Sequence, residues 1–219
     1  MMDEQATTPN WSRRVIGIAV GISLVLLGAA GGIALARSNS PDNAPTAVDI
    51  GFNQDMSWHH LQAVQMANLV PSRSNDTDVR QIAFDIGSTQ LEQVGRMKGW
   101  LNMWGELEQA PAGQLMTWMN GDHHHSASGV DGGRMPGMAT SQELARLRGL
   151  NGKEFDVLFL QLMTRHHEGG GAMSRYAADK AATPVVRNLA NSIATSQDAE
   201  VLTLKAMLTA RNAQPLGTG

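Results

Sequence analysis

Two histidine pairs, each flanked by methionines at the same spacing, are the residues of this chain best suited to chemistry. His59-His60 and His166-His167 each follow one methionine by three residues and precede another by six. Thioether sulfur suits Cu(I), and imidazole suits copper, zinc and nickel. The pattern therefore predicts a soft-metal site, best suited to copper, in each stretch, or one site that both stretches share. The predicted ligands are Met56, His59, His60, Met66, Met163, His166, His167 and Met173.

Other metals and reactions fit these residues less well. The chain has no cysteine, which excludes thiolate metal sites, disulfides and cysteine catalysis. The scarcity of carboxylates near the histidines argues against calcium and magnesium. A di-iron centre would use Glu-x-x-His motifs, and the chain has none. We predict no catalytic residue and no enzyme activity. A metal-dependent redox enzyme is the lesser alternative, with Glu200 as its only inward carboxylate.

The elements that must position the histidines come from an internal duplication with an offset of 107 residues. Phe52 matches Phe159 before the histidines, and Asp76 matches Thr183 as the N-cap candidate of the following helix. Each copy therefore reads as a helix, a turn and a second helix, over residues 48–104 and 153–212. Neither hairpin can bury its apolar stripe alone, so the two should pair into an all-α, antiparallel four-helix bundle.

At about 100° per residue, both histidine pairs project from the apolar faces of their helices. Buried imidazoles need a partner for each ring nitrogen. The second helix of each copy supplies inward polar side chains that could orient metal-bound imidazoles. These predicted outer partners are Gln90, Gln93, Gln197 and Glu200. The main alternative uses the same neighbours: a structural or interaction bundle with buried hydrogen-bond networks, methionine core packing and no metal.

The region between the copies, residues 105–152, is a connector with its own histidines and methionines. Its glycines and Pro136 favour a loop, followed by a short helix over residues 141–149. An exposed loop of this composition could capture metal, and the alternative is a solvated loop with incidental histidines. The candidate capture residues are Met116, Met119, His123, His124, His125, Met135 and Met138.

Three consecutive glycines, Gly169 to Gly171, lie inside the predicted helix that follows His167. Each costs about 1 kcal/mol relative to alanine in a helix interior. They indicate either close approach of another helix, a local opening beside His167, or a helix packed well enough to tolerate them.

The N-terminal part predicts export from the cytoplasm. Val15 to Ala36 is an uncharged apolar run of 22 residues preceded by two arginines. It predicts a transmembrane signal anchor over 15–36, with a cytoplasmic segment 1–14 and the remaining chain outside. The alternative is a signal peptide cleaved after Ala36, which would give a secreted protein. A polar linker (37–47) and a tail (213–219) flank the duplicated region.

The repeated stretch resembles the family known as domain of unknown function 305, in its exported two-repeat form. The family's Asp-x-x-Phe-x-x-x-Met-x-x-His-His pattern is matched from Asp49 to His60 and again from Asp156 to His167. The connector Met135-Pro-Gly-Met138 also resembles that of the family. This chain departs from the pattern with Trp58 and Arg165 before the histidines, and with Gln93, Gly170 and Ser174.

The resemblance implies a ferritin-like bundle fold, and some family members are linked to copper binding and copper tolerance. We therefore expect an extracytoplasmic, membrane-tethered bundle that binds copper and buffers it, sequesters it or passes it on. Its expected partners are the metal ion and, through the N-terminal helix, the membrane. The formal net charge of -3 gives no reason to expect nucleic acid, and the sequence identifies no protein partner.

Overall fold

A computed structural model describes residues 44–119 and 134–217 of the chain. Within those residues the chain is helical and contains no strand, which confirms the predicted all-α class. The elements are α2 (Ala47–Ala67), α3 (Val70–Arg73), α4 (Thr77–Trp104), η2 (Thr117–Met119), α5 (Ser141–Gly149), α6 (Gly152–Lys180) and α7 (Pro184–Thr209). None of the described helices is long and apolar enough to cross a membrane. The predicted anchor at 15–36 lies outside the described residues.

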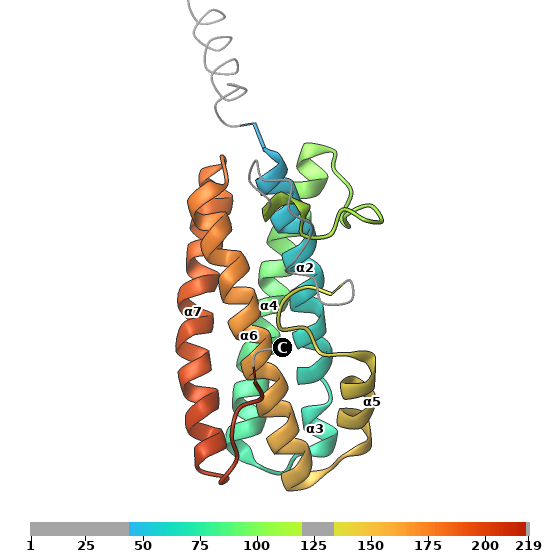
Figure 1. Cartoon of the computed structure of the whole chain (residues 1–219), viewed down its shortest axis with the longest axis vertical. Helices are drawn as coiled ribbons and strands as arrows, with labels where there is room; N and C mark the ends of the chain where they lie inside the picture. The colour runs from blue at the N-terminus through green and yellow to red at the C-terminus, as the bar shows by residue number, and fades with distance from the viewer. Residues whose placement is uncertain (1–43, 120–133, 218–219) are drawn as a thin grey trace, which may run out of the picture. The chain divides into compact units, whose positions relative to one another are not determined.

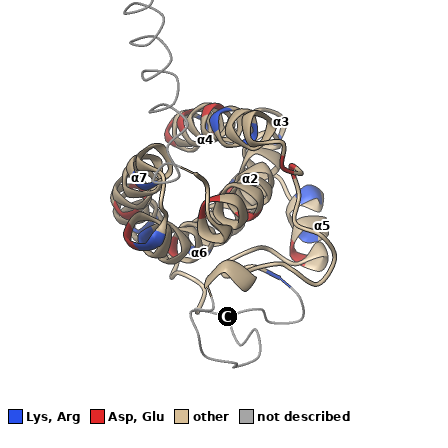
Figure 2. Ribbon diagram, turned by 90° about the horizontal axis from the view of Figure 1, so that it is seen from above, with Lys and Arg blue, Asp and Glu red and all other residues tan. Residues whose placement is uncertain are grey.

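Four long helices, α2, α4, α6 and α7, run side by side (Figure 1). In Figure 1, α2 descends and α4 returns upward, while α6 rises and α7 descends, so each consecutive pair is an antiparallel hairpin. Seen from above, the four helices surround a common interior, and α5 lies outside them (Figure 2). The two hairpins contact each other through α2 and α6, the helices that carry the histidines.

Thr183 occupies the predicted N-cap position of α7, but its hydroxyl donates to Asp49 and does not cap the helix. The starts of α4 and α5 do show side-chain capping. Asp76 caps α4 by accepting hydrogen bonds from the backbone N–H groups of Asp78 and Val79. Thr140 and Glu143 form a reciprocal capping box at the start of α5, the short helix predicted over 141–149. The turn predicted between the two helices of the first copy contains the short helix α3, in which Pro71 lies in the first turn, where proline is well tolerated.

Asp49 in the first turn of α2 ties that helix to the start of α7. Its buried carboxylate accepts hydrogen bonds from Thr46, from the backbone N–H of Ala182, and from the backbone and side chain of Thr183. Burial by itself would raise the pKa of this carboxyl group, but the hydrogen bonds from Thr183 and Thr46 outweigh it and the pKa is lowered. Asp49 therefore links the two hairpins as an ionised group.

The apolar core is divided into two clusters along the bundle. One cluster contains Phe159 with Met66 and Met163, and the other contains Phe52 with Met56. On α2 the buried histidines come between Met56 and Met66, so a polar layer separates the two apolar clusters. The fold therefore holds four imidazoles in the middle of a bundle that is apolar on either side of them.

Candidate metal centre

The four histidines of α2 and α6 form one buried layer. None of the four is more than 1% exposed. The rings of His59 and His166, one from each half of the chain, have centroids 3.8 Å apart and are tilted by 37°. Sequence neighbours are farther apart, at 6.4 Å for His59 and His60 and 6.1 Å for His166 and His167. The inward orientation predicted for both pairs is confirmed, and the fold brings the pairs together.

Among the described residues, each of the four imidazole rings in this layer makes one hydrogen bond, and in every ring the nitrogen that takes part is Nε2. His59 Nε2 lies 3.0 Å from the carbonyl oxygen of Pro136, and His166 Nε2 lies 3.0 Å from the carbonyl oxygen of His59. His60 Nε2 lies 2.8 Å from Oε1 of Gln93, and His167 Nε2 lies 2.6 Å from Oε2 of Glu200. Carbonyl and carboxylate oxygens accept hydrogen bonds, so in each ring Nε2 carries the proton and donates.

In a neutral ring with the proton on Nε2, the other ring nitrogen, Nδ1, is an unprotonated acceptor. None of the four Nδ1 atoms has a hydrogen-bond partner in the described part of the chain, although all are buried. A buried acceptor without a donor is costly, on the order of 1–3 kcal/mol. Four of them in one layer are the nitrogen lone pairs that a metal ion would use.

Burial favours the neutral form of three of these imidazoles, those of His59, His60 and His166. It lowers the pKa of His59 to about 4, although the bond to Pro136 acts in the opposite direction. Burial also lowers the pKa of His60 to about 3 and that of His166 well below its ordinary value, and neighbouring imidazoles add to both shifts. Neutral imidazole is the form that binds metal ions. At pH 7 these three imidazoles are therefore in the protonation state that binds a metal ion.

The predicted outer partners divide into two kinds. Gln93 and Glu200 each accept a hydrogen bond from a histidine 33 residues earlier, as predicted. Gln90 and Gln197 are also buried, but the side-chain nitrogen and oxygen of both have no partner within the described residues. Their amides therefore add unsatisfied polar atoms to the interior instead of orienting an imidazole.

The eight predicted ligands do not group by sequence repeat. Met56 and Met173 lie in one apolar cluster, whereas Met66 and Met163 lie in the other. The helices α2 and α6 run in opposite directions (Figure 1). The methionine that precedes the histidines on one helix therefore lies in the same apolar cluster as the methionine that follows the histidines on the other helix. Each side of the histidine layer thus has one methionine from each half, which favours the shared arrangement over two separate sets.

The methionines of the connector contact the core. Met116 and Met135 are buried in the same apolar cluster as Met56, and Met119 and Met138 pack against it while partly exposed. The candidate capture residues His123, His124 and His125 lie outside the described residues. Four of the seven residues predicted for loop capture therefore belong to or border the apolar interior.

Two glycines of the triplet, Gly169 and Gly170, are explained by close contacts on two sides of α6. A Cβ atom on Gly169 would lie 2.2 Å from the carbonyl oxygen of Pro136. A Cβ atom on Gly170 would lie 2.7 Å from Oε1 of Gln197 and 3.0 Å from Cε1 of His59. Of the readings left open by the sequence, close approach is correct. The connector and α7 both press against α6 beside the histidines, and the triplet was the sequence signal for the Pro136 contact.

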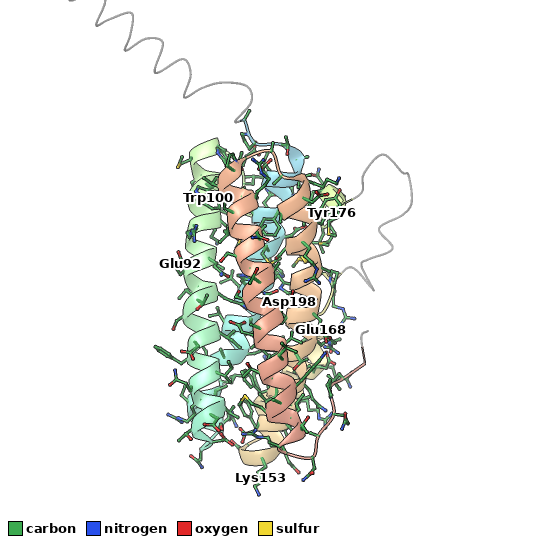
Figure 3. The ribbon with its side chains drawn as sticks, turned by 90° about the vertical axis from the view of Figure 1, so that its left-hand side faces the viewer. Glu92, Trp100, Lys153, Glu168, Tyr176 and Asp198 are labelled. Atoms are coloured by element: carbon green, nitrogen blue, oxygen red, sulfur yellow. The ribbon has the colours of Figure 1, made fainter. Side chains whose placement is uncertain are left out.

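Charged groups on the outside of α6 and α7 are paired with one another. Figure 3 labels two of these acidic residues. Glu168 pairs with Lys205 at 2.7 Å, and Asp198 pairs with Arg175 at 3.0 Å. Among the described residues, Glu200 is the one carboxylate bonded to a histidine. Within the described residues, the layer thus combines four buried imidazoles with one bonded carboxylate, that of Glu200.

A metal ion would require a small rearrangement of this layer. Within residues 44–119 and 134–217, no three or more His, Asp or Glu side chains converge as a ready-made metal-binding group. Rings 3.8 Å apart and tilted by only 37° lie nearly face to face, so the in-plane lone pairs of His59 and His166 do not meet at one point. The donor types fit copper, and one ring must rotate before both can bind one ion.

The described part of the chain is thus an all-α bundle whose interior contains four buried histidines, a residue type that commonly binds metal ions. Residues 49–208 match the domain of unknown function DUF305, and the chain belongs to this family. The expected membership is confirmed. No curated protein matches the chain.

Solved structures with the same fold include two DUF305 proteins and CopM. A DUF305 protein from Streptomyces coelicolor is 37% identical, with a TM-score of 0.69 over 81% of this chain and 99% of that one. A DUF305 fragment from Deinococcus radiodurans is 32% identical, with a TM-score of 0.63 over 76% of this chain and 98% of that one. CopM in its Cu(II)-bound form is 24% identical, with a TM-score of 0.57 over 74% of this chain and 96% of that one.

Proposed function

We propose that this chain binds copper through its buried histidine layer and buffers it, sequesters it or passes it on. One observation carries the proposal. Each of the four imidazoles donates Nε2–H to a carbonyl, amide or carboxylate oxygen and presents a buried Nδ1 without a partner among the described residues. Metal-binding histidines in proteins are oriented in this way, by donating their other N–H to such oxygens.

The choice of copper rests on the ligand types. Methionine sulfur lies in the apolar clusters on both sides of the layer, and the chain has no cysteine thiolate to favour zinc. CopM, which shares the fold, has been solved in Cu(II)-bound, Cu(I)-bound and Ag-bound forms. These forms support a copper-related role for this chain.

Within the proposal, the two halves of the chain share one interior centre. His59, His60, His166 and His167 provide the nitrogen ligands, and Met56, Met66, Met163 and Met173 are the thioethers available on either side. His123 to His125, with the partly exposed Met119 and Met138, would take part in capture. We also propose that residues 15–36 are a signal anchor or a cleaved signal, so that copper is handled outside the cytoplasm. The apolar length of that segment supports this location.

Titration of the purified full-length chain with Cu(I) against a competing chelator tests the proposal. We expect binding tighter than micromolar, lost or strongly weakened in His59→Ala and His166→Ala. Met103→Leu is a matched control, because Met103 is 79% exposed on α4 and lies outside both clusters. Circular dichroism should show that each variant is folded. Wild-type binding weaker than micromolar would rule out a copper-handling role.

The second candidate function is a structural bundle without metal. The bonds from His60 to Gln93 and from His167 to Glu200 favour it, because they satisfy one nitrogen of each imidazole without any ion. In that case His59→Ala and His166→Ala would lower the free energy of unfolding and leave copper affinity unchanged. The same titration therefore separates the two functions.

A further inference from the structure

The connector approaches the histidine layer most closely between Met135 and Ala139, here called the 135–139 segment. Gly137 has a φ of 77°, and a Cβ atom there would lie 2.4 Å from the carbonyl oxygen of Arg165. On the facing helix, a Cβ atom on Gly169 would lie 2.2 Å from the carbonyl oxygen of Pro136. Both distances are shorter than any side chain tolerates. Two glycines, one on each surface, therefore permit this contact.

The 135–139 segment is held from its other side by α2. The Gln62 side chain accepts a hydrogen bond of 2.7 Å from the backbone N–H of Ala139. It also donates a hydrogen bond of 3.0 Å to the carbonyl oxygen of Ala139. Met135, at 3% exposure, anchors the beginning of the segment in the apolar cluster. The segment is thus clamped between α2 and α6, one turn along α2 from His59.

This clamping brings the carbonyl oxygen of Pro136 to 3.0 Å from Nε2 of His59. A carbonyl can only accept, so it selects the tautomer of His59 that has the proton on Nε2. The Nδ1 atom is then left with its lone pair. His60 and His167 obtain the equivalent partner from a side chain of α4 or α7, whereas His59 depends on the connector backbone.

We infer that the 135–139 segment is a positioning element of the histidine layer, which holds His59 as the Nε2–H tautomer so that Nδ1 is available to a metal ion. The part of this inference that concerns the metal ion rests on the proposed copper function. The tautomer of His59 is a property of the metal-free protein. Gly137, Gly169 and Gln62 are the positioning residues, and they act through the Pro136 carbonyl.

Nitrogen-15 NMR of the full-length, metal-free chain labelled in its histidines tests this. The ring nitrogen shifts and their couplings to ring protons report the tautomer, and His59→Gln assigns the His59 signals. We expect one Nε2–H tautomer in the wild type. In Gly169→Ala, where the new methyl group displaces Pro136, and in Gln62→Ala, we expect a mixture that includes the Nδ1–H form.

Gly99→Ala is the matched control, because a Cβ atom at Gly99 meets nothing within 4 Å and the change raises helix propensity in the same way. It should leave the His59 signals unchanged. Gln62→Ala keeps the test decisive if Gly169→Ala does not fold. An Nδ1–H tautomer in the wild type, or an unchanged tautomer in both variants, would overturn the inference.

Copper affinity is the second measurement. Loss of an orienting partner typically reduces metal affinity 10- to 100-fold, so Gly169→Ala and Gln62→Ala should bind Cu(I) at least about tenfold more weakly than Gly99→Ala. A tautomer change without a change in copper affinity would overturn the positioning role. If the wild type binds no copper, the proposed function fails, while the tautomer measurement still decides whether the segment orients His59.

Discussion

At the scale of single residues, the two halves of the histidine layer differ by one charge. His60 donates to the neutral amide of Gln93, and His167 donates to the carboxylate of Glu200 at the corresponding position. A carboxylate bonded to an imidazole makes the ring a stronger ligand and places a negative charge near the ion. A divalent ion gains more from that charge than a monovalent ion does. Glu200 should therefore raise the preference of the shared centre for Cu(II) over Cu(I).

Glu200→Gln should weaken Cu(II) binding more than Cu(I) binding, by about tenfold in the ratio of the two affinities. Gln93→Glu should change the ratio in the opposite direction, because it adds a second carboxylate. Competition titrations of both oxidation states with both variants measure the ratio. Asp198→Asn removes a charge from the outer face of α7, where Asp198 pairs with Arg175, and should leave the ratio unchanged. Equal losses for Cu(I) and Cu(II) in Glu200→Gln would contradict this assignment.

At the scale of the elements, the bundle depends on contacts that join segments distant in sequence. Asp49 joins the first turn of α2 to the turn before α7, and Glu143 joins α5 to α6 through a bond of 2.7 Å to Arg165. These contacts hold the helices that carry the histidines in register. The fold thus uses carboxylates at helix starts, where backbone N–H groups need acceptors.

Asp49→Asn should lower the free energy of unfolding by about 2 kcal/mol, because hydrogen bonds to a charged group contribute about 1.5–3 kcal/mol. The pH dependence has a defined sign. Since the pKa of Asp49 is lowered in the folded protein, its contribution is complete above the unfolded value of 3.8 and is lost as the pH falls through the folded value.

Urea unfolding of wild type and Asp49→Asn at pH 7 and at decreasing pH measures this contribution. The difference between them should shrink below about pH 4. Asp179→Asn is a suitable control, because Asp179 is exposed and, in the part of the chain that the structure describes, forms an ion pair with its exposed neighbour Lys180 alone. A stability difference that stays constant to the lowest pH would show that Asp49 does not act as an ionised acceptor.

At the scale of the whole molecule, the histidine layer joins the two hairpins. His59 and His166 come from different halves and contact each other in the interior. An ion held by both halves would bind the folded chain and not the unfolded one. Copper binding should therefore act on the stability of the entire bundle and not on one hairpin.

Cu(I) at about 100 times its dissociation constant should stabilise the chain by about 2.7 kcal/mol, seen as a higher Tm that a strong chelator reverses. His59→Ala and His166→Ala should each abolish most of this shift, because each removes a ligand from a different half. Thermal unfolding of the full-length chain with and without Cu(I) provides the measurement. A shift that survives in one of the two variants would indicate a site confined to a single hairpin.

The sequence by itself determined the helical class, the hairpins, the helix caps and the inward direction of the four histidines. Those features follow from local rules, since helical periodicity places residues on a face and capping chemistry marks helix ends. The sequence also named Gln93 and Glu200 among four inward candidates, but the structure decided that these two bond His60 and His167 while Gln90 and Gln197 bond no histidine among the described residues.

Only the tertiary structure decided how these groups combine. The antiparallel course of α2 and α6 pairs Met56 with Met173, a grouping that depends on helix direction and not on spacing. The contact between Pro136 and His59 joins residues 77 positions apart through a backbone carbonyl, which carries no side-chain signature. The sequence thus determined which groups enter the interior, and the packing of the connector and helices decided which nitrogen of each imidazole stays free.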